Sequence, residues 1–221
     1  MPALLVLLLI LALLAPGLAA TLVFAFLMLL PAYVMVSSMF TVVLAPQQIL
    51  AVASDRRTRR NHSCEHATVN VLEEWLGPLP QAGGVATKEG FYVWGVDGIR
   101  PDTLIGAAQQ GLGRMKRGER NLALHPRCGT SMTVAQFVFA LVFLLTLGFT
   151  GYLFLEAVLV ALAATFLLGK PMGLLTQKYF TTSPDVVPLD IAEVYWTPRP
   201  RLGGTGLFFI PRGAFFFRTV Q

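Results

Sequence analysis

The first 54 residues contain no charged side chain, and residues 3–45 form one long apolar run before the first charge at Asp55. A helix that spans a bilayer needs about 20 residues, so this run is too long for one span and long enough for two. Two places favour a break, the "APG" at 15–17 and Pro31. A break at 15–17 predicts a short apolar leg, that is, a short helix before the break, followed by one full membrane span. The second predicts one long kinked span and a short interfacial leg.

Residues 1–20 also resemble a signal peptide that ends in "GLAA". Against cleavage, the first residues lack Lys and Arg, and the apolar run continues far beyond the cleavage position. We therefore expect residues 1–50 to be a membrane segment of two helices.

A second apolar block covers residues 133–169, with the turn-forming "GFTGY" at 148–152. This pattern predicts a transmembrane helical hairpin. Glu156 lies inside the block, where a carboxylate is costly unless it is paired or faces water. We expect Glu156 to lie near the turn, at the membrane surface, and a functional role is the alternative.

The composition agrees with an integral membrane protein, because only 13% of the residues are charged and 55% are apolar. Soluble domains carry about 25% charged residues. The net charge of +5 comes from arginine clusters beside the apolar segments, and no basic stripe carries interleaved aromatic residues. The expected partner is the lipid bilayer, and no nucleic acid is expected.

The basic residues also predict an orientation. Residues 46–132 carry eleven of the seventeen Lys and Arg side chains, residues 170–221 carry six, and the turn at 148–152 carries none. Positive loops stay inside, so both polar segments should be cytoplasmic. Four spans with both termini inside is the first expectation, and three is the second.

The polar segments predict a small α+β unit. Residues 51–132 form the expected metal-site domain, with a helix at 62–76 capped by Asn61, a β-hairpin at 83–97 and a helix at 100–119. In the tail, 170–221, residues 187–196 and 206–220 look like strands. The expected fold class is α+β: a polytopic α-helical membrane protein of three or four spans with a small cytoplasmic α+β unit.

The sequence "NHSCEH" at 61–66 holds the candidate site. His62 and His66 lie four residues apart on one helical face, which suits two ligands to one ion, and Glu65 lies close to that face. A carboxylate in this place can accept a proton from a metal-bound water. The spacing is that of the inverzincin signature, in which two histidines bind zinc and the glutamate is the base.

The sequence "HPRCGTS" at 125–131 supplies His125 and Cys128, so the two motifs contain all three histidines and both cysteines of the chain. Imidazole together with thiolate selects Zn²⁺ over magnesium or calcium. The predicted ligands are His62, His66, His125 and Cys128. Cys64 lies off the histidine face and ranks below them.

Two alternatives to a metal site remain open. The histidines could be interfacial residues and Cys128 a buried thiol. A disulfide between Cys64 and Cys128 is the other alternative, although a cytoplasmic location keeps thiols reduced.

"NHSCEHATVNVLEE" followed by "HPRCGTS" resembles the YqhQ-like family of bacterial membrane proteins. The chain is closer still to a related membrane family of unknown function from cyanobacteria and other phototroph-rich groups, over about residues 56–190. Members of these families are described at most as predicted metal-dependent enzymes. The resemblance implies that His62, Glu65, His66, His125 and Cys128 belong to one site. It also implies that the membrane is a bacterial inner (plasma) membrane.

Two functions follow from these residues. One is a zinc hydrolase at the cytoplasmic membrane face, with Glu65 as the general base and a peptide or lipid-linked group at the membrane as substrate. Arg127 could then stabilise an oxyanion or a lipid phosphate. The other is a structural zinc site with four protein ligands in a scaffold or assembly factor of a membrane complex.

Overall fold

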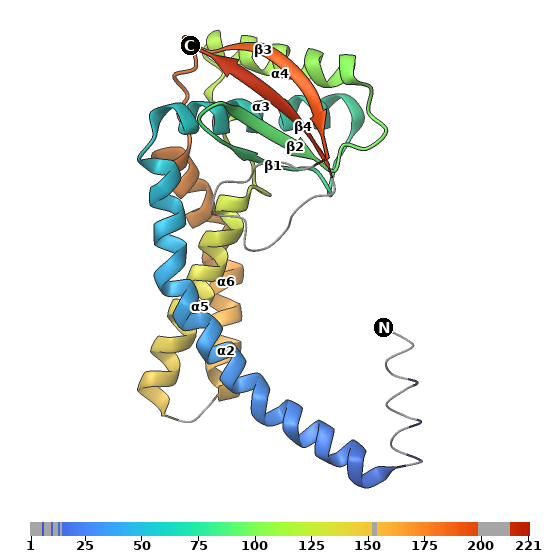
Figure 1. Ribbon diagram of the computed structural model, residues 1–221. Helices are drawn as coiled ribbons and strands as arrows, with labels where there is room; N and C mark the ends of the chain where they lie inside the picture. Colours follow the sequence, from blue (N-terminus) through green and yellow to red (C-terminus); the bar gives the residue numbers. More distant parts are fainter. Residues whose placement is uncertain (1–5, 7–9, 11–12, 14, 152–153, 199–212) are drawn as a thin grey trace.

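The computed structural model of the protein describes residues 6, 10, 13, 15–151, 154–198 and 213–221. Three helices are long and apolar enough to cross a membrane: α2 (Pro16–Ala53), α5 (Gly129–Thr150) and α6 (Phe154–Thr176), which continues into the π-helical turn η2 (Gln177–Thr181). These helices pack as a bundle, and a small α+β unit lies at one end of it (Figure 1).

Helix α2 begins at Pro16, within the first predicted break, and runs without interruption through Pro31, the second predicted break. A proline suits the first turn of a helix, where its missing N–H would have no partner. Pro31 and Pro46 lie inside the helix, as membrane helices tolerate. The described residues therefore contain three candidate spans. The predicted leg before "APG" falls mostly outside the described residues.

Helices α5 and α6 form an antiparallel pair; α5 ends at Thr150, within the predicted turn at 148–152, and α6 begins at Phe154. Small residues allow the two backbones to approach closely. A Cβ at Gly173 would lie 2.8 Å from the Cα of Ser131, and one at Gly169 would lie 3.1 Å from the Cβ of Ala135. Glu156 is exposed in the first turn of α6.

The α+β unit consists of two helices on one face of a four-stranded antiparallel sheet. The helices are α3 (Arg56–Leu76) and α4 (Pro101–Lys116), and a 3₁₀ turn, η1 (Arg120–Ala123), follows α4. The sheet has the order β1-β2-β4-β3, with β1 at Gly83–Ala86, β2 at Gly90–Trp94, β3 at Asp190–Thr197 and β4 at Ala214–Val220. The predicted hairpin is β1 and β2, whereas residues 206–212 of the last predicted strand fall outside the described residues.

Alternation along the strands gives each face of the sheet its own side chains. Phe91 and Val93 of β2 join Phe217 of β4 in a core with α3 and α4, and the rings of Phe91 and Phe217 stack at 4.7 Å. On the opposite face Tyr92 packs on Phe216. The core thus fixes α3, the helix that carries the histidines, against the sheet.

Helix α3 begins earlier than the sequence analysis predicted. Its N-cap is Asp55, whose carboxylate accepts the backbone N–H of Thr58 at 3.1 Å. The predicted cap, Asn61, is a buried helical residue, and its amide binds the carbonyl oxygen of Thr87. The predicted helix began at residue 62, so it did not include the basic run at 56–60.

The arginines of that run bind the segment that follows η2. Arg60 reaches the carboxylate of Asp185 at 2.7 Å, and Arg59 donates to the carbonyl oxygen of Thr182 at 2.9 Å. These contacts tie α3 to the chain that leaves the third candidate span.

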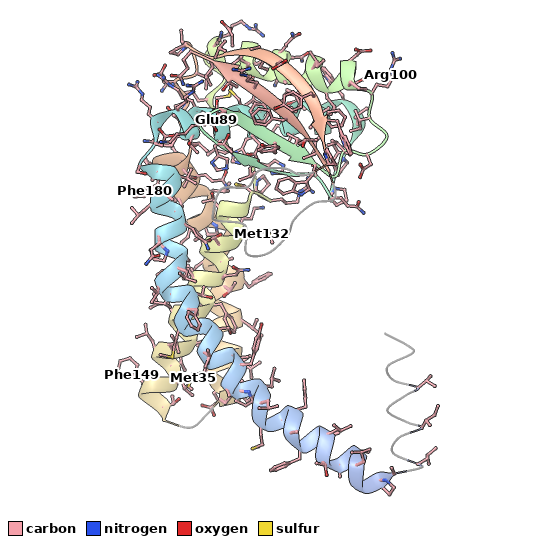
Figure 2. The ribbon with its side chains drawn as sticks, viewed as in Figure 1. Met35, Glu89, Arg100, Met132, Phe149 and Phe180 are labelled. Carbon is pink, nitrogen blue, oxygen red and sulfur yellow. The ribbon has the colours of Figure 1, made fainter. Side chains whose placement is uncertain are left out.

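The two ends of the molecule have different surfaces. In Figure 2 the labelled Met35 and Phe149 lie on the helical bundle, and Phe149 is 88% exposed. Glu89 and Arg100 lie on the α+β unit at the other end. An apolar surface around the bundle and a charged surface on the unit are compatible with a membrane protein.

Candidate metal centre

Helix α3 brings His62, Glu65 and His66 onto one buried turn at the end of the unit that faces the bundle. All three side chains are less than 10% exposed. A helical period of 3.6 residues places positions i and i+4 one above the other, and the two imidazole rings lie 4.3 Å apart.

Backbone carbonyls orient both rings in the same way. The Nδ1 of His62 lies 2.9 Å from the carbonyl oxygen of Thr181, and the Nδ1 of His66 lies 2.7 Å from that of Ala123. Each Nδ1 therefore donates its N–H to a carbonyl oxygen, which leaves the Nε2 of each ring as the atom that can bind a metal ion. Histidines that bind metals are held in this way. The Nε2 of His66 is buried and has no hydrogen-bond partner within the described structure.

Cys128 completes the group from the other side of the cavity. It is the N-cap of α5, and its Sγ lies 3.2 Å from the Nε2 of His62, although 66 residues separate the two. One ligand atom from each of His62, His66 and Cys128 fits within a set separated by at most 4.8 Å. Ligands of a tetrahedral zinc ion lie roughly 3.4–3.8 Å apart. These three side chains could hold a metal ion.

The charges in this group favour the ligand form of the thiol. Burial opposes a thiolate, but the imidazoles of His66 and His62 hold the pKa of Cys128 well below its usual range. Burial likewise lowers the pKa of His62, and the negative charge of Cys128 outweighs it and raises that pKa. A thiolate is the form of cysteine that binds metals.

Glu65 lies beside the group and is not one of its three members. Burial raises the pKa of its carboxyl to about 7, against the opposing effect of the two histidines. Its Oε2 is buried and has no hydrogen-bond partner among the described residues. A bound cation would favour the carboxylate form, since positive charge stabilises a nearby anion.

His125 lines the same cavity, with its ring centroid 6.1 Å from that of His66. Its Nε2 lies 3.4 Å from the Oε2 of Glu73, and it is not a member of the group of three. Burial, together with the neighbouring His66, lowers the pKa of His125, against the opposing effect of Glu73. Arg127 also forms an ion pair with Glu73.

Cys64 behaves as a small apolar residue. It is 2% exposed and belongs to the core between α3, α4 and the sheet. Burial raises the pKa of its thiol to about 12. Both cysteines are free, so the disulfide that remained open from the sequence is not formed.

A cavity of about 650 Å³ opens onto the group. It is bounded by the end of α2, the histidine face of α3, strand β1 and the start of α5. Gln48, Ile49 and Val52 of α2 contribute, as do Met132 and Gln136 of α5. The cavity therefore lies where the candidate spans meet the α+β unit.

Two residues that support the site were not predicted from the sequence. Gln177 of η2 is fully buried, and its side chain binds both the N–H and the carbonyl oxygen of His125 at 2.9 Å. Asn70 donates to the carbonyl oxygens of Leu122 and Leu124 and so fixes the turn that orients His66. An internal amide among apolar neighbours, as Gln177 is in "LLTQKYF", was the available signal for the first of these.

The chain is similar to one family and to one curated protein, and neither has a known function. The family described as a domain of unknown function (DUF6391) matches residues 57–194. An uncharacterized protein of Picosynechococcus sp. is 32% identical over 152 residues, which cover 61% of this chain and 68% of that protein. No solved structure matches the chain.

Proposed function

Because the chain belongs to the DUF6391 family, whose function is unknown, we propose an activity from the geometry of the site: a zinc-dependent hydrolase that acts at the membrane surface. The observation that carries the proposal is the number and placement of the groups. Three side chains form the ligand group, and a buried carboxylate with an unpartnered oxygen lies beside them in an open cavity. Three protein ligands and an open position are typical of catalytic zinc sites, whereas structural sites have four.

The residues fit zinc by their chemistry. His62, His66 and Cys128 offer two imidazoles and one thiolate, a donor set that favours zinc over hard cations. The unpartnered Nε2 of His66 is a buried lone pair of the kind that a metal ligand leaves when no ion is bound.

In the proposed reaction a bound zinc ion supplies Lewis-acid activation of a water molecule. The Oε2 of Glu65 accepts a proton from the attacking water and passes it to the leaving group. Thr181 and Ala123 keep the two histidines in the ligand tautomer. Glu73 holds His125 and Arg127 at the side of the same cavity.

The location of the cavity supports a substrate at the membrane surface. We infer that α2, α5 and α6 are membrane spans and that the α+β unit lies in the cytoplasm, from the arginine distribution in the sequence. Residues of two candidate spans, among them Val52 and Met132, line the cavity directly.

An experiment with cobalt tests for the open position without knowledge of the substrate. Co²⁺ replaces zinc in the purified protein, and the visible spectrum is measured before and after addition of acetohydroxamate. An open position predicts a changed spectrum in wild type and also in Glu65→Gln. A spectrum that acetohydroxamate leaves unchanged contradicts the hydrolase.

A second candidate, a structural zinc site, is favoured by one observation. The group contains two histidines of α3 and Cys128, the N-cap of α5. A metal ion bound there would connect the α+β unit to the helical bundle. The two candidates differ in their dependence on Glu65. General bases contribute about 10²–10⁴-fold to rate. A Glu65→Gln protein with normal zinc content that fails to complement a deletion supports the hydrolase, and one that complements fully supports the structural role.

A further inference from the structure

Strand β1 forms an edge of the sheet, because it pairs only with β2 among the described strands. The N–H of Thr87 donates to the carbonyl oxygen of Gly90 at 2.7 Å, so these two residues form a hydrogen-bonded pair. Hydrogen-bonded and non-hydrogen-bonded residue pairs alternate along an antiparallel ladder. Val85 and Tyr92 are therefore the next hydrogen-bonded pair. Gly84 and Ala86 therefore turn their N–H and C=O groups away from β2.

Among the described residues, neither Gly84 nor Ala86 forms a backbone hydrogen bond outside the ladder between β1 and β2. An unpaired edge is a template for another strand. Natural sheets usually blunt such an edge with charges, a proline or a bulge, and Gly83–Ala86 has none of these.

This edge also lies beside the candidate base. A Cβ built on Gly84 would lie 2.5 Å from the Cδ and the Oε1 of Glu65. The φ angle of Gly84 is not in the left-handed region, so the position needs glycine for space and not for conformation. Any larger residue would push the strand away from the carboxylate. The close approach brings the edge of the sheet to the reacting groups.

The cavity has the walls that an extended peptide requires. Gly83, Gly84, Val85 and Ala86 line it on one side, and the three candidate ligands line it on another. Apolar side chains from α2 and α5 complete it, including Ile49 and Met132. A strand that binds an edge gains affinity from its backbone and selectivity from pockets for alternate side chains.

We propose that the substrate is a protein segment that binds in extended form along the free edge of β1, with its backbone hydrogen-bonded to Gly84 and Ala86. This proposal rests on the proposed hydrolase function and assigns its substrate class. Water adds to the carbonyl carbon of the bound peptide and the C–N bond breaks. The products are a carboxylate and an amine, and Glu65 transfers the proton from the water to the amine nitrogen. Alternating donors and acceptors on the strand match a peptide backbone.

The test uses the full-length, zinc-loaded protein in detergent micelles and fluorescein-labelled β-casein, an unfolded protein, as the probe. Glu65→Gln serves as the background, so that the probe is bound without being cleaved. Ala86→Pro removes the N–H that faces the free edge and leaves the pairing of Val85 with β2 intact. Ala86→Val is the matched control, because it adds bulk and keeps the N–H.

Fluorescence anisotropy should show binding weakened at least tenfold by Ala86→Pro and by less than threefold by Ala86→Val, with zinc content unchanged in both. Equal binding by the two variants overturns the proposal. Hydrogen exchange of residues 83–87 in the Glu65→Gln protein gives a second readout that needs no change in β1. Slower exchange with casein bound supports the added strand, and unchanged exchange overturns it.

The two proposals fail in different ways. Casein that binds and protects β1 but is not cleaved by wild type supports the strand site and contradicts the hydrolase. Casein cleavage by wild type that is equally fast in Ala86→Pro supports the hydrolase and overturns the strand site. A third outcome is that casein neither binds nor is cleaved, while acetohydroxamate still changes the cobalt spectrum. This result overturns the peptide substrate and leaves the proposed hydrolase standing.

Discussion

Gln177 holds both backbone polar groups of His125: its Oε1 accepts the N–H and its Nε2 donates to the carbonyl oxygen, each at 2.9 Å. The same Nε2 also donates to the hydroxyl of Ser131, in the first turn of α5. One side chain after α6 therefore fixes the turn that leads to Cys128. The position of the thiolate depends on a residue that binds no metal.

Replacing Gln177 with leucine should lower both stability and metal content. The buried N–H of His125 would lose its partner, and an unsatisfied buried group costs about 1–3 kcal/mol. The carbonyl oxygen of His125 would keep only the N–H of Cys128. Chemical denaturation and zinc analysis measure the two effects. Lys178→Gln is the control, because Lys178 is exposed next to it. A Gln177→Leu protein with wild-type stability and zinc content contradicts this role.

Replacing Gly173 with alanine should weaken the pair α5–α6, because the added Cβ would lie 2.8 Å from the Cα of Ser131. Alanine otherwise favours a helix over glycine by about 1 kcal/mol. Gly148→Ala is the matched control, since Gly148 is also in a helix and has open space around it. We expect a lower melting temperature for Gly173→Ala and an unchanged or higher one for Gly148→Ala. The reverse order refutes close helix packing at Gly173.

Orientation across the membrane is a separate prediction. Single cysteines are placed at Thr150 and at Lys88 in a Cys64→Ala/Cys128→Ser background, and intact cells are treated with an impermeant maleimide. The arginine distribution predicts labelling at position 150 and none at 88. Labelling at position 88 and not at position 150 would show the opposite topology and contradict the prediction.

The sequence was informative where local chemistry determines the structure. The two apolar blocks predicted four spans or, as the second expectation, three, and the described residues contain three candidate spans. Length and hydropathy are local properties, so the blocks themselves were predictable. The turn at 148–152 and the hairpin of β1 and β2 were predicted from glycines between regular segments. Pro31, the second of the two possible breaks, lies inside α2, because membrane helices tolerate an internal proline.

The candidate site was predictable in composition and less so in geometry. Spacing along one helix placed His62, Glu65 and His66 together. The proximity of Cys128 to His62 depends on the fold and on contacts such as those of Gln177. The position of the His125 ring was the part of the site least predictable from the sequence. It lies in the same motif as Cys128, and the orientation of its turn brings its ring to Glu73.

The central claim is that His62, His66 and Cys128 hold a zinc ion with one position open. X-ray absorption spectroscopy of the zinc-loaded protein tests it most directly. The prediction is a shell of one sulfur, two imidazole nitrogens and one further light atom, unchanged in His125→Ala and changed by acetohydroxamate. A shell of one sulfur and three imidazoles that loses one imidazole in His125→Ala would contradict the claim and make the site structural.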